Sequence, residues 1–344
     1  MIFIIAALAA APTGRHSVGK PIRGLVAPVF TPFKKDGDGA VVLDLDKVES
    51  QAHWLNQSGV HWVFTGGSTG ESVDLSVAER KALAERWIQV APTFGQQVIV
   101  HVGTDSVVDA RDMAAHAEQH GADAIAAMPP TYIRPGSPEA LVQTVASVAA
   151  AAPLTPFYYY HIPMKTGVDF SVADLVASAD SRIPTFRGVK FTCKNLDDMQ
   201  IALSHKFTQG ESWRIGQPPD ILYGRDQWLL AATAYGVEGA VGTSYNFNAE
   251  LQAKVLNAPK DIATAQRAQL ATSTFIKVIV DFDAAHSGFY SWKMAMEMMG
   301  YPVGPPRLPY IEPSQEATTA LRSMVHGWCK ATDEDLRPTW CNVL

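Results

Sequence analysis

The sequence predicts an α/β protein in which eight parallel strands close into a (β/α)8 barrel, with a C-terminal helical extension. From Ile22 onward, short apolar runs of strand length alternate with amphipathic stretches of helical period, and eight such strand-then-helix units follow one another. After about residue 250 the strand-like runs stop and helical patterns continue. The 344 residues are enough for a barrel of about 250 residues with additional helices.

Each expected strand is a short apolar run. The strands are predicted over residues 25–30, 62–65, 98–102, 124–128, 155–160, 188–191, part of 213–223, and 239–242. Ser76 is predicted to cap a helix, because Glu79 three residues later completes a capping box. Gly236 is expected to close a helix over residues 226–235. Further helices are expected over residues 43–57, 106–120, 138–151 and 171–178, with a short one around Gln200.

A doubly wound open sheet is the alternative architecture. Such a sheet normally has a glycine-rich turn after its first strand, where the backbone approaches a pyrophosphate. The corresponding turn here is Thr31-Pro32-Phe33, which contains no glycine. The sequence therefore favours the barrel.

Three regions are expected along the chain. Residues 21–260 form the barrel, and residues 261–344 form helices packed on it. Residues 1–20 lie outside this fold and begin with the apolar run MIFIIAALAAAP. No positive charge precedes that run, as a secretory signal would require, and it is too short to span a membrane. It is either an appendage or a targeting segment.

Composition excludes some partners. The net charge of -6 and the pI near 5.9 leave no basic stripe for nucleic acid. Residues after the N-terminal run contain no stretch that is long and apolar enough for a membrane span. The three cysteines argue against a disulfide framework and indicate a reducing compartment, the cytoplasm, although Cys329 and Cys341 could pair.

Lys190 is the first candidate for chemistry. It lies in the strand-like segment Gly188-Val189-Lys190-Phe191, between apolar neighbours. Burial disfavours the ammonium form, so the pKa of this lysine should fall, and a neutral amine can attack a ketone to give a Schiff base. The alternative is a lysine that reaches water or pairs with a carboxylate.

Further candidates lie where predicted strands end, because a barrel carries its active site at that edge. Tyr160 could move a proton to and from a substrate hydroxyl, or it could be one of several packed aromatic residues. The turn with Ser68 and Thr69 could bind a carboxylate, or it could be an ordinary loop. Thr243 follows the last strand.

Metal and hydrolase signatures are weak. His116 and His120 have the spacing of one helical turn, but no HExxH motif is present, and a solvated helix face is favoured. Neither a GxSxG motif nor a P-loop occurs. No metal site is expected.

Four blocks in order resemble one enzyme superfamily. They are GGSTGES (66–72), YYYHIPMKTG (158–167), GVKFT (188–192) and GRDQ…GAVGTSYN (224–246). As a set they resemble the N-acetylneuraminate lyase and dihydrodipicolinate synthase superfamily, and most of all its lyase branch. The resemblance implies a (β/α)8 class I aldolase, a homotetramer, that takes small keto acids and needs no cofactor beyond the lysine. It further implies reversible cleavage of N-acetylneuraminate to N-acetylmannosamine and pyruvate.

The resemblance also implies roles for individual residues. Lys190 would form the Schiff base with pyruvate, Tyr160 would transfer protons, and Ser68 with Thr69 would hold the pyruvate carboxylate. The remainder of the sugar acid would contact Thr192, Gly224, Asp226, Gln227 and Thr243. Tyr132 matches, more loosely, a loop aromatic residue that some members send across a subunit interface.

Two positions depart from the lyase pattern. Gln227 stands where the lyases usually have Glu. Lys165 stands where the lyases usually have an apolar residue and the synthases have an Arg that binds a carboxylate. These departures support an alternative: a dihydrodipicolinate synthase or a 2-keto-3-deoxy sugar acid aldolase that uses the same Schiff base. A third possibility is a barrel that senses a keto acid without turning it over.

Overall fold

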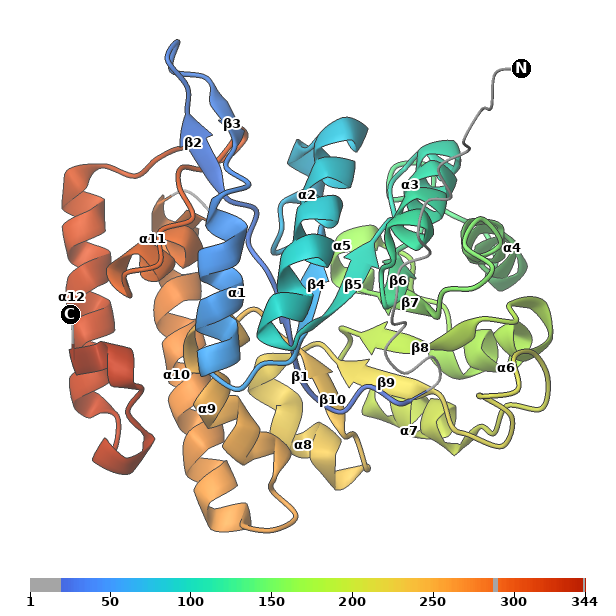
Figure 1. The fold of residues 1–344 in the computed structure, drawn as a ribbon. Coiled ribbons are helices and arrows are strands. Elements are labelled where there is room, and N and C mark those ends of the chain that lie inside the picture. The colour runs from blue at the N-terminus through green and yellow to red at the C-terminus, as the bar shows by residue number, and fades with distance from the viewer. Residues whose placement is uncertain (1–19, 287–289, 343) are drawn as a thin grey trace, which may run out of the picture.

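The computed structural model describes residues 20–286, 290–342 and 344. Eight parallel strands close into a barrel in the order β1-β10-β9-β8-β7-β6-β5-β4 (Figure 1). This closure confirms the predicted (β/α)8 barrel and excludes the open sheet. The strands are β1 Gly24–Pro28, β4 Trp62–Thr65, β5 Gln97–His101, β6 Ala124–Ala127, β7 Phe157–His161, β8 Phe186–Phe191, β9 Asp220–Tyr223 and β10 Gly239–Val241.

Helices follow the strands on the outside of the barrel (Figure 1). Ser76 caps α2 with the predicted capping box, in which its hydroxyl accepts from the Glu79 N–H and the Glu79 carboxylate accepts from the Ser76 N–H. These helices are α1 Lys47–Gln57, α2 Val77–Val90, α3 Val107–His120, α4 Pro138–Ala149, α5 Pro163–Thr166, α6 Val172–Arg182, α7 Leu196–Ser204, α8 Leu229–Ala234 and α9 Tyr245–Leu256.

Two predicted helices begin later than expected. Residues 43–46 were expected in a helix, but β2 Phe33–Lys35 and β3 Val41–Leu43 form an antiparallel hairpin and α1 starts only at Lys47. The Asp36 carboxylate accepts from the N–H groups of Asp38 and Ala40, and so stabilises the turn of this hairpin. Likewise, residues 226–228 form a 3-10 turn that precedes α8.

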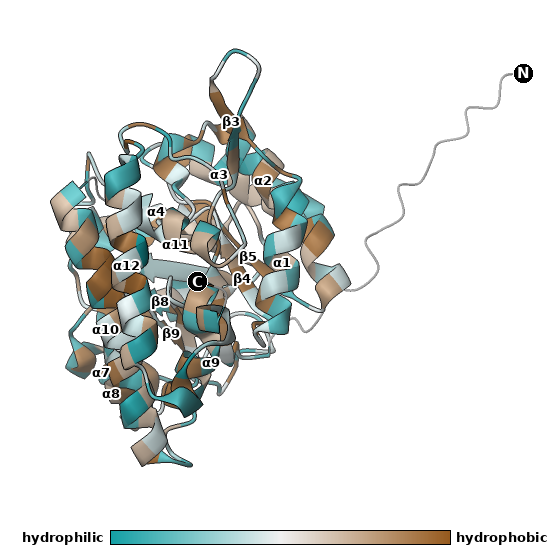
Figure 2. Cartoon of the chain, turned by 90° about the vertical axis from the view of Figure 1, so that its left-hand side faces the viewer, coloured by the Kyte–Doolittle hydropathy of each residue, from teal (hydrophilic) through white to brown (hydrophobic). Residues whose placement is uncertain are grey.

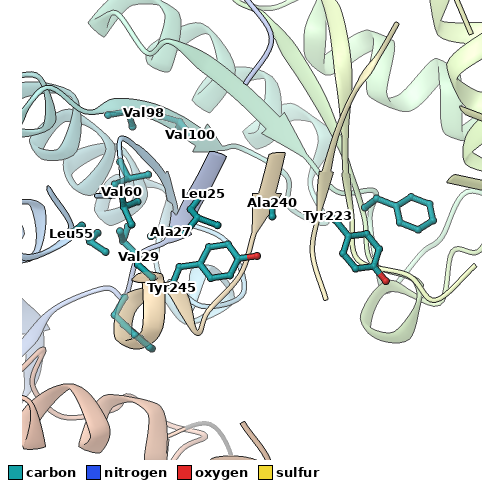
Figure 3. Packing of buried hydrophobic residues seen from close by; sticks show 14 of the residues in the cluster. Leu25, Ala27, Val29, Leu55, Val60, Val98, Val100, Tyr223, Ala240 and Tyr245 are labelled. Atoms are coloured by element: carbon teal, nitrogen blue, oxygen red, sulfur yellow. The ribbon is translucent and has the colours of Figure 1, made fainter. Parts of the chain in front are cut away.

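The apolar core has two layers, which follow from the alternation of side chains along each strand. On β7, Tyr158 and Tyr160 point into the barrel, where they pack with Phe64 and Val26. Tyr159 belongs to the outer layer between the strands and the helices. Figure 3 shows part of this outer cluster.

The segment after the barrel is helical, as predicted. It contains α10 Ile262–His286, α11 Tyr290–Met298 and α12 Gln315–Ala331. Along α12, Leu321, Val325 and Trp328 are buried at helical spacing. Hydrophilic and hydrophobic positions are interspersed along this helix, as the colours in Figure 2 show. Trp328 packs against Phe275 of α10 with 4.9 Å between ring centroids.

The C-terminal cysteines are paired, which settles the alternative that the sequence left open. Cys329 and Cys341 form a disulfide, while Cys193 is free. Because a disulfide is present, the cysteine pattern no longer supports the expected reducing compartment. In the described part of the chain, no helix has the length and apolar character needed to cross a bilayer. The N-terminal run of residues 1–19 lies outside the described residues.

Candidate active site

A cavity of about 360 Å³ opens at the carboxyl ends of the strands. It brings together ten of the residues that the sequence singled out: Ser68, Thr69, Tyr160, Lys165, Lys190, Thr192, Gly224, Asp226, Gln227 and Thr243. Because parallel strands end at one rim of the barrel, residues far apart in the sequence meet there. The clustering is the expected result of the fold.

Lys190 and Tyr160 form the centre of the cavity. They are register partners on the adjacent strands β8 and β7, so both side chains point into the barrel. The Lys190 Nζ lies 4.1 Å from the centroid of the Tyr160 ring and 3.8 Å from that of Phe64. The amine is therefore held between two aromatic faces.

The environment of Lys190 favours an uncharged amine. The side chain is only 4 % exposed, and burial lowers the pKa of Lys190 to about 7, although the Asp226 carboxylate opposes the shift. A substantial fraction of the molecules then carries a neutral, nucleophilic amine at neutral pH. An ordinary surface lysine has almost none.

The phenol of Tyr160 keeps its proton at neutral pH. Burial raises the pKa of Tyr160 to about 12, against hydrogen bonds that lower it. Its Oη lies 3.4 Å from the Ser68 hydroxyl, and its ring stands edge-on to His101. The phenol can donate its proton to one substrate atom and take a proton from another.

The turn after β4 supplies two hydroxyls to the cavity. Thr69 Oγ1 lies 2.7 Å from Oγ1 of Thr243, which follows β10 at the same rim. Thr31 Oγ1 donates to the carbonyl of Gly70 at 2.5 Å and holds the turn from the side of β1. Together these bonds fix the direction of the hydroxyls.

The next residue, Glu71, adopts a left-handed conformation with φ of 52°, which is uncommon outside glycine. Its buried carboxylate lies 2.6 Å from Nζ of Lys293, a residue of α11 that is also buried. Lys293 also donates to the carbonyl of Thr31 at 3.0 Å. Sequence reasoning missed this pair, because the partners are far apart and neither lies in a local motif.

The polar side of the cavity is built around Asp226. Its buried carboxylate accepts from the backbone N–H of Ser244 at 2.9 Å, and burial raises the pKa of Asp226. Beside it, a side chain at Gly224 would overlap the Thr192 hydroxyl. Gly224 thus leaves room for that hydroxyl at the cavity wall.

The mouth of the cavity is cationic and partly apolar. Lys165 and Gln227 are exposed there, and Arg225, which the sequence analysis did not single out, is half-buried and donates to the Met164 sulfur at 3.3 Å. Ile276, Val280 and Trp292 of the C-terminal helices complete the lining. No sequence motif marks these three residues.

Tyr132 is the one candidate that the structure does not bring to the cavity. It is 89 % exposed and does not line the pocket of its own chain. Its loop is held by Asp105, whose carboxylate accepts from the N–H of Tyr132. Within one subunit, Tyr132 therefore does not reach the cavity.

Potential metal ligands lie elsewhere in the described part of the chain. One group contains Glu85, His116 and His120, and a second contains His161, Asp169 and Cys193. None of these residues lines the cavity. The chemistry that the cavity itself offers is a buried nucleophilic amine, a phenol that can transfer protons, and hydroxyls that can hold a carboxylate.

Comparison with known proteins agrees with this geometry. Residues 21–327 match the model of the dihydrodipicolinate synthetase family. N-acetylneuraminate lyase of Xenopus tropicalis is 39% identical over 295 residues, which cover 85% of this chain and 91% of the relative. The human N-acetylneuraminate lyase is 36% identical, over 88% of this chain and 92% of the relative.

A solved structure gives the same answer for the fold. N-acetylneuraminate lyase from Aliivibrio salmonicida superposes with a TM-score of 0.79 at 32% identity, over 90% of this chain and 97% of that chain. A dihydrodipicolinate synthase superposes with a TM-score of 0.76 at 25% identity. The cavity and these matches agree, and the chain belongs to the dihydrodipicolinate synthetase family.

Proposed function

We propose that the chain is an N-acetylneuraminate lyase, which cleaves N-acetylneuraminate to N-acetylmannosamine and pyruvate through a Schiff base on Lys190. The observation that carries the proposal is the buried Lys190 amine beside Tyr160, with its pKa lowered to about 7. Support comes from relatives of 36–39% identity that bear this activity in their names.

The reaction begins when the neutral Lys190 amine attacks the C2 ketone of the open-chain sugar acid. Loss of water gives an iminium ion, which withdraws electrons from the C3–C4 bond. Tyr160 gives its phenol proton to the hydroxyl that leaves as water, and the resulting phenolate takes the proton of the C4 hydroxyl as that bond breaks. C4 then leaves as the aldehyde of N-acetylmannosamine, C3 remains as an enamine, and Tyr160 is a phenol again. Protonation of C3 and hydrolysis of the imine then release pyruvate and the free amine.

Other residues of the cavity would position the substrate. Ser68 and Thr69 would hold the carboxylate next to C2, because their hydroxyls lie at the rim beside Tyr160 and Thr243. Thr192, Gly224, Asp226, Gln227 and Thr243 would contact the hydroxyl chain of the sugar. Lys165 would lie at the open end of the cavity.

Assembly and location complete the proposal. We expect a homotetramer in which the exposed Tyr132 meets a neighbouring subunit, and its exposure together with that of Ile133 supports such a contact. The expected cytoplasmic location stays a prediction, which fractionation of cells that express the full chain would test. Light scattering of the purified chain would test the assembly.

Release of pyruvate from N-acetylneuraminate tests the activity. We expect turnover by the unaltered chain and none by Lys190→Met, which keeps an unbranched apolar side chain in the same strand. Lys260→Met, which removes an exposed lysine after α9, serves as the matched control and should retain full activity. No pyruvate release by the unaltered chain would refute the proposal.

A sister aldolase is the second candidate, which the uncharged Gln227 and the cationic Lys165 favour. Such an enzyme would condense pyruvate with aspartate semialdehyde, or cleave a 2-keto-3-deoxy sugar acid, through the same Schiff base. Assays of these substrates beside N-acetylneuraminate decide between the candidates by kcat/KM. Binding of keto acids without any turnover would instead indicate a sensor.

A further inference from the structure

A cluster of three potential metal ligands joins two neighbouring helices on the outside of the barrel. Glu85 comes from α2, and His116 and His120 come from α3, which packs against α2. One ligand atom from each of the three side chains lies within 4.8 Å of the others. We propose that these residues bind one divalent transition metal ion of the zinc class.

The two distances from Glu85 to the histidines bracket the spacing of a tetrahedral site. With zinc–ligand bonds near 2.1 Å, two ligands of a tetrahedral ion are about 3.4 Å apart. In the structure, Glu85 Oε1 lies 2.8 Å from Nε2 of His116 and 3.8 Å from Nε2 of His120. These values lie on either side of the required spacing, and all three ligand atoms lie within 4.8 Å of one another. Rotation of the side chains would have to bring the three atoms to the spacing of the ion.

The orientation of His120 favours a metal ligand. Its Nδ1 lies 2.8 Å from the backbone carbonyl of His116, and a carbonyl oxygen can only accept, so Nδ1 carries the hydrogen. With the hydrogen on Nδ1, the nitrogen that is left to bind a metal is Nε2, which lies 3.8 Å from Oε1 of Glu85. Metal-bound histidines are commonly held by such a hydrogen bond from the second ring nitrogen.

The other two ligands suit the same ion. The side chain of His116 is 14 % exposed, and its Nε2 lies 2.8 Å from Oε1 of Glu85, so an ion between these two atoms would replace the hydrogen that they now share. Glu85 is 39 % exposed and adds one negative charge. The nearby Lys81, which would repel a cation, is paired with Asp112 at 2.6 Å.

The ligand set decides the class of metal. Two imidazoles and one carboxylate suit zinc, nickel or copper, whereas magnesium and calcium prefer oxygen ligands alone. Three protein ligands leave the fourth position to water. The ion would connect α2 to α3, because its ligands come from both helices. None of the three residues lines the catalytic cavity, so the ion would take no part in the cleavage reaction.

Titration of the chelator-treated full chain with ZnCl2 tests the site. We expect about one zinc ion per chain, a zinc-dependent rise in melting temperature, and visible absorption bands of tetrahedral Co²⁺ when cobalt replaces zinc. Glu85→Gln should weaken zinc binding by about 10-fold or more, and the double variant His116→Asn/His120→Asn should abolish it. His61→Asn, which removes an exposed histidine elsewhere, is the matched control and should bind as tightly as the unaltered chain.

Melting curves of the metal-free variants show whether each one folds. Glu85→Gln is the most conservative of them and keeps the test valid if the double variant does not fold. Equal zinc affinity of Glu85→Gln and the unaltered chain, or no zinc binding by the unaltered chain, would overturn the proposal. Pyruvate release does not enter this test, so its outcome is separate from that of the proposed activity.

Discussion

Lys293 of α11 and Glu71 of the turn after β4 form a buried ion pair, with 2.6 Å between Lys293 Nζ and Glu71 Oε1. The pair connects the C-terminal helices to the turn that carries Ser68 and Thr69. Burial lowers the pKa of Lys293 and raises that of Glu71, while the attraction between them opposes both shifts. The C-terminal helices therefore contribute to the shape of the active site as well as to its lining.

Breaking this pair should destabilise the protein and loosen the turn. Lys293→Met leaves the Glu71 carboxylate buried without a partner, which costs about 3–5 kcal/mol. We expect a lower free energy of unfolding in urea and a higher KM, because the hydroxyls of Ser68 and Thr69 lose their fixed direction. The double variant Lys293→Met/Glu71→Gln should recover part of the stability. A Lys293→Met variant with unchanged stability and KM would contradict this role.

The rate of Schiff base formation should depend on pH through Lys190. Only the neutral amine attacks the ketone, and burial lowers the pKa of Lys190 to about 7. We therefore expect kcat/KM to rise about tenfold per pH unit below pH 7 and to level off above it. A pH profile of pyruvate release from pH 5 to 9 measures this, and an inflection near the ordinary lysine value would count against the buried amine.

Removing the charge of Asp226 should move that inflection. The carboxylate stabilises the ammonium form and so raises the pKa of Lys190, against the effect of burial. Asp226→Asn removes this attraction, so the inflection in kcat/KM should shift to lower pH. A shift to higher pH would mean that Asp226 acts on Lys190 in another way.

Tyr160→Phe should separate proton transfer from binding. The phenylalanine ring keeps the packing against Lys190 and Phe64 but has no hydroxyl. We expect kcat to fall by about 10²–10⁴-fold with little change in KM. Tyr159→Phe, in the outer layer of the barrel wall, is the control and should keep nearly full activity. Equal activity of both variants would remove Tyr160 from the mechanism.

The sequence predicted the barrel and the centre of its active site for a physical reason. The strand-then-helix alternation predicts parallel strands, and parallel strands end at one rim, so the sequence places Lys190, Tyr160 and Thr243 together. Local helix-capping motifs were predicted equally well, as the Ser76–Glu79 capping box at the start of α2 shows.

What the sequence did not predict depends on packing between distant segments. Trp292 lines the cavity and Lys293 pairs with Glu71 through the way α11 packs in the fold, and no local pattern marks either residue. The position of Glu85 opposite His116 depends in the same way on how α2 packs against α3. Leu43, the first residue of the helix expected at 43–57, instead pairs with Phe33 of β2, and residues 44–46 form the turn that leads into α1, because tertiary pairing overrides their helical spacing.

Borohydride trapping with peptide mapping is the most direct test of the central claim. The protein is incubated with pyruvate and sodium borohydride, digested, and analysed by mass spectrometry. We predict a reduced pyruvyl adduct on the peptide that contains Lys190 and on no other lysine, with no adduct in Lys190→Met. An active enzyme without this adduct, or with an adduct at another lysine, would contradict the account.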